Sequence, residues 1–208
     1  MIMESFPVGP LQCNCVVLGD ETTREGVVID PGDEPEKIDE ILDHHRLDLK
    51  FVLHTHGHID HILAADHLRR TRGASVRIHE ADLFLWKGVQ MQAAFLGMRV
   101  NEPGPVDGAL RQGDRIPFGS YELEVIETPG HTPGSVCLLL RGPTPILFSG
   151  DTLFQRGIGR TDLWGGSESA IINSIQSRIF TLDEGTLVHP GHGPQTTIHE
   201  EKRDNPFL

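Results

Sequence analysis

The stretch HTHGHIDH, residues 54–61, places four histidines and one aspartate within eight residues of a 208-residue chain that has twelve histidines in all. Imidazole and carboxylate groups are good ligands for zinc, iron and manganese. His56, His58 and Asp60 occupy every second position, and in an extended segment this spacing sends all three to one side. His61 follows at the expected start of a helix. Four donors so close together are too many for one tetrahedral ion, so the spacing predicts two adjacent ions.

Three further candidate ligands stand at the ends of predicted strands. His131 in TPGHTPG, Asp151 in SGDTLF and His192 in VHPGHGP each neighbour a glycine. Glycine allows a sharp turn and the close approach of a ligand. Because functional side chains are often carried on turns at strand ends, the sequence predicts a metal centre assembled from several strands.

Short strands and amphipathic helices must position these groups. Residues 121–127, YELEVIE, alternate apolar and acidic side chains, which is typical of a half-buried strand. Ser167 is a good N-cap for a helix that repeats Ile171, Ile175 and Ile179. Several neighbouring strands resemble hairpins, which predicts an α/β (α+β) fold of mixed sheets with helices outside. The predicted strands are 13–19, 26–30, 50–54, 75–79, 121–127, 136–140, 145–149 and 186–189, and the predicted helices are 33–46, 59–71, 167–180 and 197–203.

The irregular segment 88–110 allows two interpretations. Its apolar side chains, Met91, Phe95, Leu96 and Met98, predict either a lid or contact surface, or a short helix that fills the core. The oligomeric state is left open by the sequence.

Composition and charge narrow the class of protein. The length suits one domain over residues 1–208. The chain has no run of about 18 apolar residues, so we expect no membrane span. A net charge of −12 argues against a nucleic-acid partner, because phosphate contacts need a basic surface. Three cysteines and the lack of a secretory pattern at the N-terminus predict a cytoplasmic protein without disulfides. Cys13 and Cys15 are interpreted as strand packing residues.

The complete set, H-x-H-x-D-H followed by single H, D and H, resembles the ligand pattern of the metallo-β-lactamase superfamily over nearly the whole chain. The resemblance implies a four-layer αββα sandwich of two mixed β-sheets flanked by helices, with metals at one edge. It implies two divalent ions, for which zinc is preferred and iron or manganese are alternatives. One ion would be held by His56, His58 and His131, the other by Asp60, His61 and His192, and Asp151 would bridge them.

Two adjacent divalent ions suggest hydrolysis. They lower the pKa of a shared water and present hydroxide near neutral pH. Asp60 and Asp151 would hold and orient that hydroxide, which makes them the candidate catalytic residues. The same ions polarise a carbonyl oxygen and accept charge on a leaving group, which suits esters, thioesters, amides and phosphoesters. The chain has no G-x-S-x-G motif for a competing serine nucleophile.

The remaining motifs narrow the substrate. Residues 150–166, GDTLFQRGIGRTDLWGG, and 190–207, PGHGPQTTIHEEKRDNPF, resemble the glyoxalase II-like group. This implies hydrolysis of a small-molecule thioester such as S-lactoylglutathione or a related S-acyl thiol, because a thiolate leaves without a strong protein acid. Only 16 residues follow His192, so we expect no appended C-terminal helical domain to contact glutathione, as in a compact single-domain bacterial branch. The loops at 88–110 and 155–166 would then hold the thiol.

Two other residues have competing interpretations. Arg160, in the glycine-rich loop, is the candidate substrate-binding cation, although an ion pair with Asp162 is the favoured alternative. Asp30 precedes a Pro-Gly turn and either orients a ligand histidine or stabilises that turn. We expect no metal contact from the other histidines, which are His44, His45, His54, His67, His79, His189 and His199.

Other functions remain as alternatives. Persulfide dioxygenases share the scaffold and a GRTD segment like residues 159–162, and they use a single iron, whereas the PGHG at 190–193 resembles the hydrolases. A lactonase or other ester hydrolase, a β-lactamase and an inactive binding protein rank lower. A nuclease is also disfavoured, because the members of this superfamily that cut RNA add a domain or arm that binds nucleic acid, and this acidic sequence shows neither.

Overall fold

Two mixed β-sheets pack face to face in the computed structural model, which describes residues 1–208. The first sheet contains, in spatial order, β1 (Ile2–Val8), β2 (Cys13–Gly19), β3 (Glu25–Ile29), β4 (Asp48–Leu53), β5 (Ser75–Ile78) and β6 (Gly108–Ala109). The second contains β14 (Thr196–Thr197), β13 (Leu187–Pro190), β10 (Ile146–Gly150), β9 (Val136–Leu140), β8 (Tyr121–Glu127) and β7 (Arg115–Phe118). A separate small hairpin pairs β11 (Leu153–Phe154) with β12 (Gly157–Ile158).

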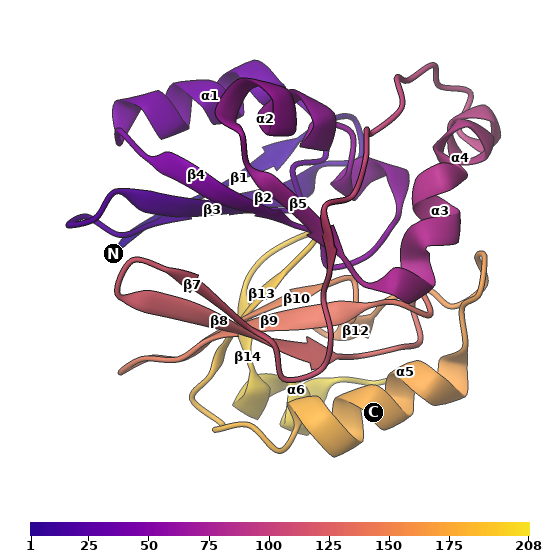
Figure 1. Cartoon of the computed structure of the whole chain (residues 1–208). Helices are drawn as coiled ribbons and strands as arrows, with labels where there is room; N and C mark the ends of the chain where they lie inside the picture. Colours follow the sequence, from indigo (N-terminus) through magenta and orange to yellow (C-terminus); the bar gives the residue numbers. More distant parts are fainter.

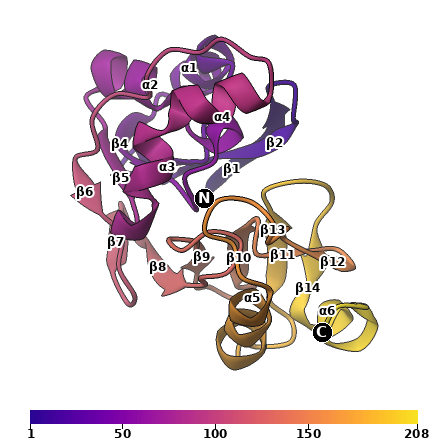
Figure 2. The same cartoon turned by 90° about the vertical axis from the view of Figure 1, so that its right-hand side faces the viewer.

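Helices cover both outer faces. Figure 1 shows α1 (Pro35–His44) and α2 (Ala65–Arg72) over the first sheet and α5 (Glu168–Ser174) and α6 (Ile198–Asp204) over the second. A π-helical turn, η3 (Ile175–Ile179), continues α5. Figure 2, the quarter-turned view, shows α3 (Leu83–Lys87) and α4 (Val89–Phe95) crossing in front of the first sheet. The layers follow the αββα order that the resemblance implied, and none of the helices is long and apolar enough to cross a membrane.

Alternation along the strands separates the core into layers. In β2, Val16 and Leu18 face the second sheet, whereas Val17 between them packs beneath α1 and α2. Strand β9 is buried along its whole length because it has a strand on each side and apolar layers above and below. Its Cys137 and Leu139 pack together with Ile171 of α5 in the apolar layer beneath that helix. Successive side chains therefore serve different layers, as a period of two requires.

The predicted elements are present with small shifts of their ends, and six short or peripheral strands were not predicted. These are β1, β6, β7, β11, β12 and β14. The largest difference lies in the predicted helix 59–71, which is divided into a 3₁₀ turn, η1 (Ile59–His61), and α2. The amide of Ala64 donates to the carbonyl of Pro31, 3.0 Å away, so the α-helical pattern begins only after it.

The segment 88–110 begins with a short helix, as one of the two interpretations proposed. Val89 and Ala93 of α4 are buried in the apolar layer that also contains Val17, and Met98 packs partly against this layer. The prediction that this segment fills the core is wrong for Met91, Phe95 and Leu96, which are 49%, 67% and 42% exposed. Helix α4 therefore fills the core with one face and presents an apolar face to solvent.

Candidate metal centre

The seven candidate ligands come from both sheets and meet at one edge. Strands β8 and β10 are each antiparallel to β9, and β13 is parallel to β10, so β8, β10 and β13 run in the same direction. Their carboxyl ends carry His131, Asp151 and His192. His56 and His58 lie in the bend after β4 of the facing sheet. The fold thus brings residues separated by up to 136 positions into one site.

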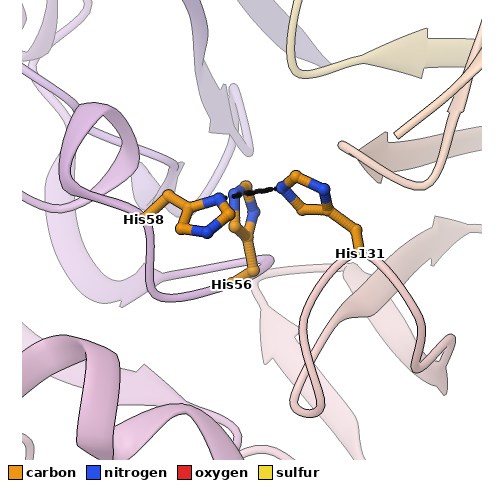
Figure 3. Close-up of side chains that lie close together, drawn as sticks. All are labelled: His56, His58 and His131. Carbon is orange, nitrogen blue, oxygen red and sulfur yellow. Dashed lines mark hydrogen bonds between the residues drawn. The ribbon is translucent and has the colours of Figure 1, made fainter. Parts of the chain in front are cut away.

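Three histidines form the first cluster. The Nε2 atom of His131 lies 2.9 Å from Nδ1 of His58 and 3.3 Å from Nε2 of His56 (Figure 3). All three side chains are buried. One ligand atom from each lies within 4.8 Å of the others, which is close enough for all three to contact a single ion.

A second cluster contains Asp60, His61 and His192. An oxygen of Asp60 is 3.1 Å from Nε2 of His192 and 3.6 Å from Nε2 of His61. Asp151 lies between the clusters, with one oxygen 3.6 Å from His61 and the other 3.6 Å from His131. This position is the one that a bridging carboxylate would need.

Asp60 does not lie on the same side as His56 and His58, as an extended segment would have placed it. The chain leaves the extended conformation at Ile59 and enters η1, so Asp60 turns away from His56 and His58 to join the second cluster. The role of glycine beside the ligands is confirmed at Gly191, where a Cβ atom would overlap an oxygen of Asp151.

Hydrogen bonds fix the orientation of two of the histidine rings. His131 donates from Nδ1 to the carbonyl of Arg160 at 2.8 Å, which leaves its Nε2 lone pair directed at the cluster. The Thr55 hydroxyl donates to Asp30 at 2.6 Å, so it accepts from Nδ1 of His56 at 3.1 Å. His56 therefore also presents an unprotonated Nε2 to the cluster.

Asp30 contacts a candidate ligand, which favours the interpretation that it orients a ligand histidine over a role in the turn alone. One of its oxygens lies 3.0 Å from Nδ1 of His61, and the other accepts from the amide of Thr55 at 2.8 Å. Asp30 thereby contacts one candidate ligand directly and orients His56 through the Thr55 hydroxyl. The sulfur of Cys13 is 3.4 Å from the same nitrogen of His61, a contact that the sequence did not predict.

The donor set fits divalent cations. Nε2 of His61 and Oδ1 of Asp151, which lie 3.6 Å apart, are buried without a hydrogen-bond partner, and this is costly unless another group satisfies them. Nε2 of His131 and Nε2 of His56 face each other as two lone pairs at 3.3 Å, an arrangement that a cation relieves. Burial, together with the neighbouring imidazoles, lowers the pKa of His58 to about 3 and that of His56 well below its ordinary value. Both rings are thus neutral, as metal ligation requires.

A cavity of about 200 Å³ opens over the first cluster and Asp151. Its floor includes His58 and His131, and its walls are largely apolar. The rings of Phe95 and Trp164 meet edge to face with centroids 5.6 Å apart, and the Trp164 ring lies 6.3 Å from that of His58. The lining residues are Leu11, His58, Ile59, Asp60, Gln92, Phe95, Leu96, His131, Asp151, Arg160, Leu163 and Trp164.

Arg160 lines this cavity but is already paired. Its guanidinium donates two hydrogen bonds to Asp162, at 2.7 and 2.8 Å, which confirms the favoured alternative. Its backbone carbonyl, rather than its side chain, contacts a candidate ligand. The other histidines lie outside the clusters: His54 is fully buried beside Trp86, and burial lowers its pKa to about 4.

Sequence reasoning missed two buried side chains that hold the ligand loops. Asp82, in the 3₁₀ turn η2 (Glu80–Asp82), and Gln92 of α4 both bind the backbone between His56 and Ile59. Both are at most 1% exposed. In the sequence, the one indication of such a role is that Asp82 and Gln92 each stand among apolar residues.

The family profile described as Metallo-beta-lactamase superfamily matches residues 8–203. An uncharacterized protein of Mycobacterium leprae is 43% identical over 100% of this chain and 99% of its own length. The hydroxyacylglutathione hydrolase GloC of Haemophilus influenzae is 35% identical over 100% and 98% of the two chains. The mitochondrial persulfide dioxygenase ETHE1 of Bos taurus is 34% identical over 92% of this chain and 70% of its own length.

Solved structures agree with the fold. The B3 metallo-beta-lactamase BLEG-1 superposes with a TM-score of 0.91 at 37% identity, covering 100% of this chain and 99% of its own. The protein TTHA1623, solved in a di-iron-bound form, superposes with a TM-score of 0.86 at 38% identity, covering 99% and 100%.

Proposed function

The chain belongs to the metallo-beta-lactamase superfamily, and from this premise we propose that it is a binuclear metal-dependent hydrolase that cleaves a thioester. The substrate class is an S-acyl thiol, of which S-lactoylglutathione is one example. The products are a carboxylic acid and a free thiol, formed when water adds to the acyl carbon and the carbon–sulfur bond breaks. The similarity to the GloC hydrolase supports this choice among the reactions of the superfamily.

Two divalent cations would be held by the clusters described above, with Asp151 between them. Cations in these positions supply Lewis acidity, which lowers the pKa of water and polarises the acyl carbonyl. Zinc is our first choice for an all-nitrogen-and-oxygen donor set, with iron or manganese as alternatives. Asp60 and Asp151 accept hydrogen bonds from the attacking water and so direct it toward the acyl carbon.

The ionisable groups of the cavity carry the argument for a thioester. Apart from the candidate ligands, the only ionisable side chain that lines the cavity is Arg160, which is always protonated and cannot act as an acid. The leaving group of an amide or alkyl ester is far more basic, so without a separate proton donor the cations alone would have to stabilise it. A thiol has an ordinary pKa of about 8.5, so its thiolate leaves without that help. The cavity is therefore better suited to thioesters than to amides.

A single experiment tests this order of reactivity. The metal-loaded protein is assayed with a thioester, an oxygen ester and an amide that carry the same acyl group, with S-lactoylglutathione as a further substrate. We expect the thioester to be hydrolysed fastest and the amide slowest. Amide hydrolysis as fast as thioester hydrolysis would contradict the proposal, and faster cleavage of the oxygen ester would favour the lactonase alternative.

Persulfide oxidation is the second candidate, and the similarity to ETHE1 favours it. That reaction would consume oxygen with a persulfide substrate and would use one iron per chain. Oxygen uptake on glutathione persulfide together with metal analysis separates the two functions. A small-molecule substrate, no nucleic-acid partner and a cytoplasmic location remain part of the proposal.

A further inference from the structure

The two loops that form the three-histidine cluster are joined by one buried carboxylate. Oδ2 of Asp82 accepts a hydrogen bond from the amide of Gly57 at 2.8 Å, and Gly57 stands between His56 and His58. Oδ1 of the same carboxylate accepts from the amide of Gly134 at 2.6 Å. Asp82 thus contacts the bend after β4 and the loop that carries His131.

A third hydrogen bond comes from the residue next to His131. The hydroxyl of Thr132 donates to Oδ2 of Asp82 at 2.7 Å. Asp82 is completely buried, so its carboxylate depends on these donors. Two of them are backbone amides, which can only donate, so the position requires an acceptor on both oxygens.

Both loops are shaped to receive this carboxylate. A Cβ atom on Gly134 would lie 2.7 Å from Oδ1 of Asp82. A Cβ atom on Gly57 would lie 3.1 Å from the backbone carbonyl oxygen of Asp82 and 2.9 Å from Cβ of Leu85. A side chain at either glycine would push the loop away from Asp82. The glycines beside the ligands therefore serve a close contact that lies behind the cluster.

Gln92 secures only one of the two loops. Its amide nitrogen donates to the carbonyl of Gly57 at 3.0 Å, and its oxygen accepts from the amide of Ile59 at 3.0 Å. Both backbone groups of Gly57 are thus bound by side chains from the segment 82–92. The connection to the His131 loop, however, is made by Asp82 alone of these two residues.

We propose that Asp82 is a positioning residue that sets the separation between the His56–His58 bend and the His131 loop, and thereby the metal affinity of the three-histidine site. The inference rests on the assignment of these histidines as metal ligands in the proposed function. Asp82 lines neither the cavity nor a metal-ligand cluster. Residues that orient ligands typically contribute about 10- to 100-fold to metal affinity, which sets the scale of the effect.

The chain supplies a matched control at the opposite end of the sandwich. Asp20 is also buried and accepts from the amides of Thr22, Thr23 and Ser120 at 2.7, 3.2 and 2.6 Å. Ser120 precedes β8 and His131 follows it, so the two carboxylates lie at opposite ends of that strand. Asp20 therefore joins two loops in the same way, but remote from the metal ligands.

The test compares Asp82→Asn with Asp20→Asn by calorimetric titration of the apo-proteins with Zn²⁺. Asparagine keeps the size of the side chain but turns an N–H toward a backbone N–H. We expect Asp82→Asn to weaken one of two binding events about 10- to 100-fold. Asp20→Asn should leave both binding events unchanged, even though we expect thermal unfolding to show a loss of stability in each variant.

Wild-type affinity in Asp82→Asn, or equal weakening in both variants, would overturn the proposal. If Asp82→Asn does not fold, Thr132→Val removes one donor only, and it should weaken the same binding event by a smaller factor. Unchanged affinity in Thr132→Val would then overturn it. The titration needs no turnover, so a failure of the proposed thioesterase activity would be seen separately, as intact zinc binding without hydrolysis.

Discussion

Removal of metal should lower the thermal stability of the protein by an amount that can be worked out from the two clusters. Each cluster draws ligands from both sheets: His56 and His58 meet His131, and Asp60 and His61 meet His192. An ion in either cluster can be held fully only while the sheets are packed together. Binding to the folded state alone stabilises it, and the unfolded chain lacks this arrangement of ligands.

The expected magnitude follows from linkage. At a free metal concentration one hundred times the dissociation constant, one site adds about 2.7 kcal/mol, and two sites add about 5.4 kcal/mol. For a chain of roughly 150–250 residues, 1 kcal/mol shifts the melting temperature by about 2–4 °C. One occupied site should therefore raise the melting temperature by roughly 5–11 °C, and two sites by roughly twice as much.

Thermal unfolding of chelator-treated protein, followed at increasing Zn²⁺ concentrations, measures this shift. His192→Ala should retain about half of it, because only the second cluster loses a ligand. His199→Ala is the control, since His199 is exposed and pairs with Glu184. A melting temperature that does not respond to zinc in the wild-type protein would refute the reasoning, as would an equal loss in the two variants.

Three further predictions concern the reaction, the cavity and the fold. Replacing His56 or Asp151 by Ala should lower thioester hydrolysis by at least about a hundredfold and reduce the bound metal per chain; unchanged turnover and metal content would contradict the site. Phe95→Ala should lower kcat/KM about tenfold through KM, whereas Met91→Ala on the same helix, outside the cavity, should not, and equal effects would argue against an apolar substrate contact. Hydrogen bonds from the Ser120 and Thr22 amides lower the pKa of Asp20 from 3.8 to about 2. Its stabilising effect should be complete above pH about 4 and should fade as the pH falls through about 2, so the melting temperatures of wild type and Asp20→Asn should converge there.

The residues of the metal centre were easier to predict from the sequence than the conformation that holds them. A ligand pattern such as H-x-H-x-D-H is local, and its chemistry is evident from the residue types. Its geometry is not local: Asp60 and His61 occupy a 3₁₀ turn because the surrounding backbone is bound by distant groups, including the Pro31 carbonyl and Gln92. A period of two holds only while the backbone stays extended, and here the backbone turns at Ile59, six residues after the end of β4.

Strands were predicted well where both neighbours are apolar and poorly at the sheet edges. Strand β9 is buried throughout and has an unmistakable apolar run. Strand β1 is an edge strand whose middle residues, Glu4 and Ser5, are exposed, and it is held by its antiparallel register with β2. Backbone pairing of this kind leaves little trace in residue type. The same holds for Asp82, whose role depends on two loops that approach it only after folding.

The two ends of the sandwich are joined by different means, and this difference bears on function. At one end, Asp20 links the β2–β3 turn to the β7–β8 turn by hydrogen bonds alone. At the other, Asp82 makes a similar link, but the neighbouring histidines crowd lone pairs together and leave buried nitrogens without partners. Such a cluster opposes close packing of the sheets until a cation is bound. The hydrogen bonds of the Asp82 carboxylate to Gly57 and Gly134 then keep His131 close to His56 and His58 before a cation binds. The metal end of the fold therefore combines repulsion between the histidine nitrogens with hydrogen bonds that hold the loops together, whereas at Asp20 the loops are joined by hydrogen bonds alone.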